Sequence, residues 1–264
     1  CLLVYGKARV IRKNLKAMPD FLYKVCLETR DIEALKKGDF RVSSVNGSHI
    51  LLRQVTSPHR DNDKKKGVII SSVSGKLSAL NFDLDPYYYR PFLEANHLKY
   101  LYELNIYQND NKDWIISIVE INPVTKDIRP IIEFLCYLYQ IGPHGVIIDE
   151  YFFFNGSKGE TYDSPMIFAF NEGENLLGEK EMDTYVWGMT SYMGTQKLLV
   201  VALLKIEWEL HFIDPLTGDT IDIVVLKLCK HYHRITLLKQ VNSSLLIGLD
   251  DGSVELLEVF KYKL

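Results

Sequence analysis

A repeated segment restricts the fold of this chain more than any other feature. Residues 121–127 (INPVTKD) resemble residues 213–219 (IDPLTGD), which begin 92 residues later. In each copy an Asn or Asp starts a turn, a Pro fixes the backbone φ, and the polar residues that follow remain in water. The two copies therefore predict equivalent turns that close a strand, two structural units of 46 residues apart.

Further strand candidates extend the repeat along the chain. Their centres lie near residues 80, 121, 169, 213 and 257, so the spacings are 41, 48, 44 and 44 residues. A period in the forties is typical of the four-stranded blades of a β-propeller. One small antiparallel sheet cannot bury both of its faces alone, whereas radial stacking of several sheets does. We expect about five blades in residues 67–264 of a single domain over residues 1–264, and whether the ring is complete is left open.

Individual strands follow from local patterns. Residues 68–73 and 77–82 flank a Ser-Gly turn and predict a hairpin. Residues 184–190, 198–203, 207–214 and 220–228 predict four successive strands. The aromatic run at 151–154 predicts a buried strand that ends in a turn at Asn155 and Gly156.

Residues 17–38 predict a helix inserted before the sheets. Pro19 suits a first turn, and Phe21, Leu22, Val25 and other apolar residues recur roughly at helical spacing. Two lysines and Gly38 are typical of a helix end. We expect this helix to pack on the main domain, and the alternative is a docking helix for a partner.

The last unit carries a family resemblance. His231 stands before the strand candidate 235–239, which is followed by 244–249 and, after an Asp-Gly hairpin, by 253–259. This stretch resembles a WD40 repeat, although Leu257 and Glu258 replace the Trp-Asp signature and Lys230 replaces the usual Gly. The resemblance implies an all-β fold of divergent WD40-type blades and a structural role for His231.

The chain ends soon after the third strand of this unit. An unpaired third strand would expose a row of backbone donors and acceptors. Residues 2–5 and 8–11 are strand-like, so we expect a segment within residues 1–11 to pair with the last unit and close the ring.

The composition bears on the cellular location of the protein and on the partners it can bind. The net charge is -3 and the pI is near 6.2, so no basic nucleic-acid footprint covers the whole chain. No apolar run reaches the roughly 18 residues of a membrane span.

The four cysteines are isolated, which favours a reducing, intracellular setting in the nucleus or cytoplasm. Three Asn-X-Ser sequons are typical of turns and are not expected to be glycosylated. Because residue 1 is Cys, we expect the numbering to begin inside a longer protein.

Cys229, His231 and His233 form the sharpest chemical pattern. At i, i+2 and i+4 they would share one face of a strand and offer a thiolate and two imidazoles to a metal. No fourth ligand is visible nearby, and the WD40 resemblance makes His231 structural, so neither metal nor cofactor is expected. The acidic pairs at 149–150 and 179–181 are expected to be exposed turns, and no phosphate loop or nucleophile motif is present. We therefore expect no enzymatic activity.

The most suggestive binding segment is Tyr87, Tyr88, Tyr89 and Arg90 between two prolines. Clustered Tyr and Arg are the composition of interface hot spots. The equally weighted alternative is that these tyrosines pack beneath a connection between blades. The sequence thus predicts a non-catalytic protein–protein interaction scaffold, a subunit of a larger intracellular complex. The alternative is a propeller that binds RNA or DNA within a nuclear assembly.

Overall fold

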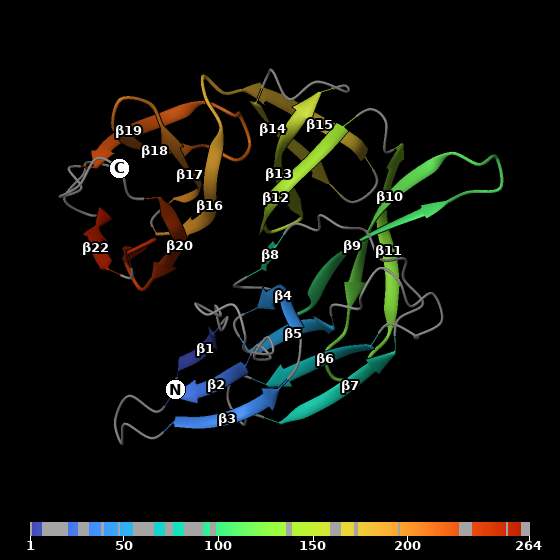
Figure 1. Ribbon diagram of the computed structural model, residues 1–264. Helices are drawn as coiled ribbons and strands as arrows, with labels where there is room; N and C mark the ends of the chain where they lie inside the picture. Colours follow the sequence, from blue (N-terminus) through green and yellow to red (C-terminus); the bar gives the residue numbers. More distant parts are fainter. Residues whose placement is uncertain are drawn as a thin grey trace, which may run out of the picture.

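The protein is built from antiparallel sheets arranged around a ring, as the computed structural model shows (Figure 1). It describes residues 2–6, 21–25, 32–37, 40–46, 48–54, 66–71, 76–81, 92–95, 99–135, 139–158, 165–171, 174–194, 196–226, 234–251 and 253–259. These residues form 22 strands and no α-helix. No helical segment of this part of the chain has the length and hydropathy of a membrane span.

The strands group into six successive units, which we call blades 1 to 6. Blade 1 consists of β1 (Leu2–Gly6), β2 (Phe21–Val25) and β3 (Ile32–Lys37). Blade 2 consists of β4 (Phe40–Asn46), β5 (His49–Gln54), β6 (Lys66–Ser71) and β7 (Leu77–Asn81). Blade 3 consists of the sheet of β9 (Leu101–Gln108), β10 (Trp114–Ile121) and β11 (Ile128–Leu135), and we count with it the preceding inner strand β8 (Phe92–Ala95), which pairs with strands of blades 2 and 4 and not with β9.

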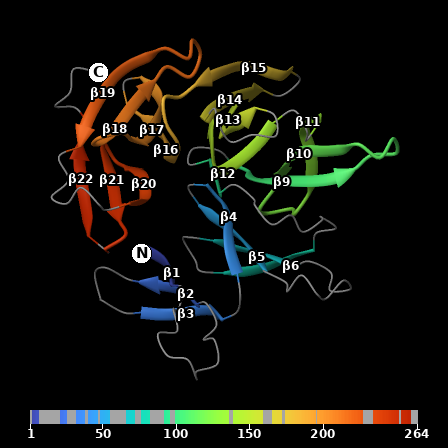
Figure 2. The same cartoon turned by 45° about the horizontal axis from the view of Figure 1, so that its top comes forward.

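The second half of the chain continues the same pattern. Blade 4 consists of β12 (Tyr139–Ile148), β13 (Tyr151–Lys158), β14 (Pro165–Asn171) and β15 (Glu174–Glu181). Blade 5 consists of β16 (Val186–Met193), β17 (Lys197–Leu204), β18 (Trp208–Ile213) and β19 (Thr220–Leu226). Blade 6 consists of β20 (Ile235–Val241), β21 (Ser244–Leu249) and β22 (Val254–Glu258). Figure 2 shows the blades following one another around the ring in chain order.

The core lies between neighbouring blades. Four clusters of buried side chains are described, and each joins two successive blades, from blades 2 and 3 through to blades 5 and 6. Successive residues of one strand serve opposite interfaces: Phe152 and Phe154 pack toward blade 3, whereas Phe153 packs toward blade 5. This is the alternation that a pleated strand imposes. The burial of side chains from both blades at each interface supports the prediction that neighbouring sheets pack face to face.

The inner strand of blade 3 departs from a simple ring. β8 pairs in parallel with both β4 and β12, the first strands of blades 2 and 4. Its Glu94 is buried, and the Thr190 hydroxyl of blade 5 donates to that carboxylate over 3.1 Å. A buried carboxylate needs such donors because leaving it unsatisfied in the interior is costly. The inner strands of blades 2 to 5 are therefore linked by backbone and side-chain hydrogen bonds.

The predicted repeat is confirmed as a repeat of structure. Asn122 follows β10 and Asp214 follows β18, which are the third strands of blades 3 and 5. In both turns the Asn or Asp side chain accepts bonds from the backbone N–H groups two and three residues later. Both also place a residue at positive φ, Lys126 at 70° and Gly218 at 74°. The two turns are equivalent and lie two blades apart.

Two other expectations are corrected. The described parts of the predicted helix, Phe21–Val25 and Ile32–Lys37, are paired strands of blade 1. The apolar residues there also suit a strand, because Phe21, Tyr23 and Val25 alternate, and pairing with distant residues outweighs local helical spacing. The expected turn at Asn155 lies inside β13, which continues to Lys158.

The prediction of ring closure is tested only in part. The described segment at the start of the chain, Leu2–Gly6, pairs with Phe21–Val25 and not with the last blade. Within the described residues β22 pairs with β21 alone. Residues 7–11, the rest of the predicted closing segment, lie outside the described residues.

Candidate functional site

Two of the predicted sites lie outside the described part of the chain. These are the partner-binding segment at Tyr87, Tyr88, Tyr89 and Arg90 and the group of Cys229, His231 and His233. Among the residues that the structure describes, no group of three or more His, Cys, Asp or Glu side chains is arranged to hold a metal.

The most distinctive described surface is a patch of Tyr185, Trp187, Ile206 and Arg234, which we call the aromatic patch. Ile206 is 95% exposed and Tyr185 is 48% exposed, while Trp187 is half-buried. The Tyr185 and Trp187 rings meet edge to face with their centroids 5.4 Å apart. The guanidinium of Arg234 lies 5.4 Å from the centroid of the Trp187 ring, a cation–π arrangement. Aromatic and cationic groups thus meet here, and the exposed Ile206 lies in a neighbouring turn.

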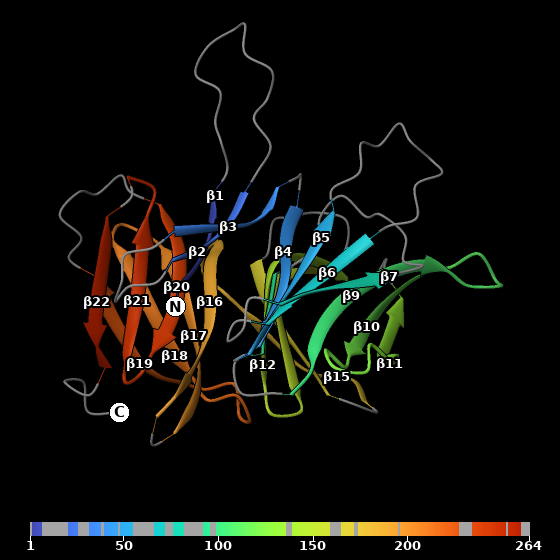
Figure 3. The same cartoon turned by 90° about the horizontal axis from the view of Figure 1, so that it is seen from below.

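Strand register brings these residues to one end of the blade. Val186 at the start of β16 pairs with Leu203 near the end of β17, and Leu204 pairs with Trp208 at the start of β18. The connection that carries Tyr185 and the turn that carries Ile206 are therefore neighbours. Blade 6 contributes Arg234 directly before β20, and Figure 3 shows the upright strands whose ends carry these connections. The patch spans the boundary between blades 5 and 6.

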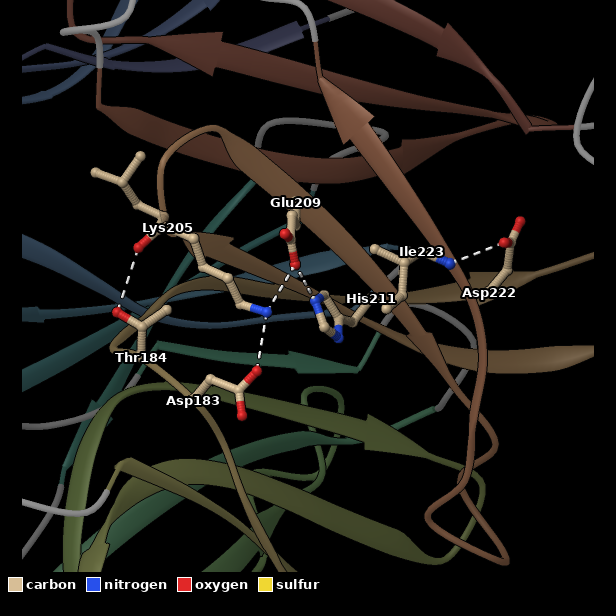
Figure 4. Close-up of polar contacts among 8 residues, drawn as sticks. Asp183, Thr184, Lys205, Glu209, His211, Asp222 and Ile223 are labelled. Carbon is tan, nitrogen blue, oxygen red and sulfur yellow. Dashed lines mark hydrogen bonds and ion pairs between the residues drawn. The ribbon is translucent and has the colours of Figure 1, made fainter.

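An ion-pair network holds the two loops together (Figure 4). The Lys205 ammonium lies 2.8 Å from the Asp183 carboxylate and 3.1 Å from the Glu209 carboxylate. The Glu209 carboxylate lies 2.8 Å from Nε2 of His211, whose side chain is buried. A hydroxyl bond from Thr184 to the Leu204 carbonyl, 3.2 Å, adds a second link between the loops.

The network shifts the pKa values of its members in the directions expected for paired charges. The hydrogen bond from Lys205 lowers the pKa of Asp183. The hydrogen bond with His211, and then Lys205, lower the pKa of Glu209, although burial opposes this. Bonds to Asp183 and Glu209 raise the pKa of Lys205. All three groups therefore stay charged near neutral pH, and their stabilisation is lost in acid as the carboxylates protonate.

The network connects the two loops at one end of blade 5, and it extends through Glu209 to the buried ring of His211. The exposed members of the network are worth little individually, but together they fix the geometry of two loops.

A buried Asn provides further support beneath the patch. Asn155 Oδ1 accepts the backbone N–H of His144 over 2.9 Å, and its Nδ2 donates to the Val186 carbonyl over 3.4 Å. Burial lowers the pKa of His144, although a bond with the backbone of Trp187 opposes this. Blade 4 thereby contacts the backbone of Val186, between Tyr185 and Trp187, and the backbone of Trp187 itself.

Burial also bears on the sequons. Asn155 and Asn46 are buried, and the Asn46 side chain bonds to the backbone of residues 48, 49, 99 and 100. Neither Asn is accessible to a glycan in the folded protein. Asn242 is exposed in a turn at positive φ of 54°.

Reasoning from the sequence missed the aromatic patch. Its four residues belong to three segments, and none of those segments alone has the composition of a binding surface. A weak signal was present, because Ile206 stands between Lys205 and Glu207 where a strand pattern stops.

Comparison with solved structures bears on the fold. The β-propeller domain of the Trilobed protease from Pyrococcus furiosus is 12% identical, with 90% of this chain and 73% of that chain covered at a TM-score of 0.51. The chain has a β-propeller fold. TolB from Acinetobacter baumannii is 11% identical at a TM-score of 0.49, and Saccharomyces cerevisiae Sqt1 is 11% identical at a TM-score of 0.44. The matches cover 90% and 92% of this chain and 59% and 66% of those chains, so this chain spans less than two thirds of either protein. No protein family and no curated protein matches the sequence.

Proposed function

We propose that this chain is a non-catalytic protein–protein interaction scaffold of the divergent WD40 type, and a subunit of a larger assembly. The observation that carries the proposal is the aromatic patch. Ile206, Tyr185 and Arg234 are exposed, although burial of Ile206 and Tyr185 would be favourable. Tyr, Trp and Arg are the residue types that contribute most of the energy of protein interfaces.

The rigidity of the patch supports the same function. Loops that are already ordered lose little conformational entropy on binding, so more of the contact energy appears as affinity. Here Lys205 links the loop of Tyr185 to the turn of Ile206, and Arg234 lies against Trp187. The patch is thus held in one arrangement without a partner.

The strands of blade 6 support the finer assignment. β20, β21 and β22 occupy the three segments that resemble a WD40 repeat. The Leu257 of that repeat, at the position of the signature Trp, packs against the buried cluster between blades 5 and 6. A propeller of this kind presents its loops on a rigid ring, as an interaction scaffold requires.

The test is affinity capture from native extract with identification by mass spectrometry. The variant Tyr185→Ser/Ile206→Asp removes two anchors of the patch, and we expect each protein partner that uses the patch to bind about 30-fold more weakly or worse. The matched control is Leu216→Asp, because Leu216 is 71% exposed in a turn at the opposite end of blade 5.

Three results would contradict the proposal. The first is an unchanged set of partners in the patch variant, and the second is an equal loss in the Leu216→Asp control. The third is capture of RNA or DNA in place of protein, which would favour nucleic-acid binding. Thermal melts of all three proteins establish that folding is unchanged.

A further inference from the structure

The cation of the aromatic patch, Arg234, is exposed and its position is fixed. Its guanidinium lies over the Trp187 ring, 5.4 Å from the ring centroid. Its backbone carbonyl accepts the N–H of Asp250 over 3.0 Å, which holds it against the turn after β21. The Trp187 ring is fixed in turn, because the rings of Tyr185 and Trp208 meet it edge to face at 5.4 and 6.0 Å. The charge of Arg234 therefore has a defined place on the surface without a partner.

A guanidinium that lies over a ring keeps its capacity for hydrogen bonding. Its five N–H donors lie in its own plane, whereas the ring contacts its face. Within the described part of the chain, no carboxylate lies within ion-pair distance of Arg234. The neighbouring cation, Lys205, is by contrast already paired with Asp183 and Glu209 (Figure 4). Arg234 is therefore the cation of this surface that is suited to an anion from a partner.

Exposed apolar surface accompanies this cation. Tyr185 contacts Trp187 and is about half exposed, and Ile206 is almost fully exposed in the neighbouring turn. The ion pairs of Lys205 and the hydroxyl bond of Thr184 hold that turn against the loop of Tyr185. Covering such side chains with apolar groups is favourable. A ligand that matches the whole patch therefore carries an apolar side chain and an anion a short distance apart.

The surrounding charges favour one kind of anion over another. The two loops and the start of β18 carry the carboxylates of Asp183, Glu207 and Glu209 against the ammonium of Lys205. RNA or DNA would bring many negative charges close to these carboxylates and would be repelled. A single carboxylate placed at Arg234 gains the attraction with little of that repulsion. It also matches the planar guanidinium, which binds carboxylates through two parallel N–H bonds.

We propose that the aromatic patch binds an extended segment of a partner protein in which an Asp or Glu carboxylate pairs with Arg234 and a nearby large apolar side chain covers Tyr185 and Ile206. This inference rests on the proposed scaffold function and specifies the chemistry of the partner. Arg234 then sets the specificity of the patch. A segment with Lys or Arg at that place brings two cations together, and a neutral segment removes water from the guanidinium without supplying an anion.

Selection from random peptides tests the chemistry of the segment. The probe is a phage-displayed library of short random peptides, first depleted on the variant Tyr185→Ser/Ile206→Asp and then selected on the 264-residue chain. We expect the retained peptides to share an Asp or Glu close to a large apolar residue. Retained peptides without a shared acidic residue, or a library that yields no peptide dependent on the patch, would overturn the inference.

Charge reversal tests the role of Arg234 directly. For one selected peptide, Arg234→Glu should weaken binding about tenfold or more, and a peptide with Lys in place of its acidic residue should bind that variant better than the original peptide does. The matched control is Lys112→Glu, which reverses an exposed charge in the turn between β9 and β10 of blade 3. Charges at that distance are screened, so binding should change less than about twofold. Unchanged binding by Arg234→Glu, or an equal loss in the control, would overturn the inference.

Two milder variants separate the charge from the shape of the side chain. Arg234→Lys keeps the charge and loses the planar pair of donors, so its affinity for the peptide should lie between those of the wild type and Arg234→Ala. Equal affinities of all three proteins would overturn the inference. Capture from native extract distinguishes this failure from that of the scaffold function. Partners lost from Tyr185→Ser/Ile206→Asp but retained by Arg234→Glu would overturn this inference alone, whereas partners retained by both variants would contradict the scaffold function as well.

Discussion

Phe170 is the residue at which the packing of successive blades can be measured most directly. It lies in β14 of blade 4, is fully buried, and stacks on Phe134 of β11 in blade 3, with ring centroids 4.7 Å apart and planes 8° apart. It also meets Phe154 of its own blade edge to face at 6.1 Å. The stacked pair therefore joins two successive blades.

The expected magnitude follows from these contacts. Phe170→Ala removes a buried ring and leaves a cavity, so it should lower the free energy of unfolding by about 3–5 kcal/mol. Phe170→Leu keeps most of the volume and should cost less than about 1.5 kcal/mol. The part due to the stacked pair itself should appear as a coupling of about 0.5–1.5 kcal/mol between Phe134→Leu and Phe170→Leu.

The assay is urea unfolding of the wild type, the two single variants and the double variant. Tryptophan fluorescence follows Trp114 of blade 3 together with Trp187 and Trp208 of blade 5, and far-UV circular dichroism follows all blades. Coincident transitions from the two probes would show that the blades unfold together, which makes the free energies comparable.

A double-mutant cycle on a second aromatic pair, within one blade, is the control. Tyr192 and Phe212 form an edge-to-face pair at 6.5 Å within blade 5, and their coupling reports packing inside one blade. Additive effects of Phe134→Leu and Phe170→Leu, with normal coupling in the control pair, would refute the described contact between blades 3 and 4.

Three further predictions concern single positions. Lys126→Gly should raise the free energy of unfolding by up to about 1 kcal/mol, and Gly218→Ala should lower it by about as much, because both positions have positive φ. Melting temperatures that move the other way would contradict the equivalence of the two turns. Burial lowers the pKa of His144 in the folded protein. Its contribution to the free energy of unfolding is therefore present above the ordinary histidine pKa of about 6.5 and is lost as the pH falls toward the lower folded value. His144→Asn should make the free energy of unfolding, measured in urea, fall less between about pH 7.5 and 5.5, and an unchanged slope would contradict this. Asn155→Ala should destabilise the protein by about 1–3 kcal/mol, because it leaves a buried N–H and a buried carbonyl unpaired, whereas a cost below about 0.5 kcal/mol would assign no role to these bonds.

Where sequence reasoning succeeded, the controlling interactions were local. The turns after Ile121 and Ile213 depend on hydrogen bonds between residues two to five positions apart, and those residues are visible in the repeated segment. The hairpin of β6 and β7 and the strands of blades 5 and 6 also lie close to their predicted positions. Alternating side chains and turn residues determine such features without help from distant parts of the chain.

Where it failed, distant residues decided the outcome. Phe21–Val25 is compatible with a helix by spacing, and it is a strand because Leu2–Gly6 and Ile32–Lys37 pair with it on both sides. Asn155 looks like a turn residue, yet bonds to His144 and Val186 satisfy its buried amide inside a strand. In both cases the local pattern permits two conformations with similar free energies, and pairing selects one.

The sequence by itself therefore determined the all-β character, the repeat in the forties and the position of the equivalent turns. Only the tertiary structure decided that Ile206, Tyr185, Trp187 and Arg234 share one surface, because three separate segments meet at the boundary of blades 5 and 6. Period and turn chemistry are short-range properties, whereas a binding surface on a propeller is assembled from segments that the fold brings together.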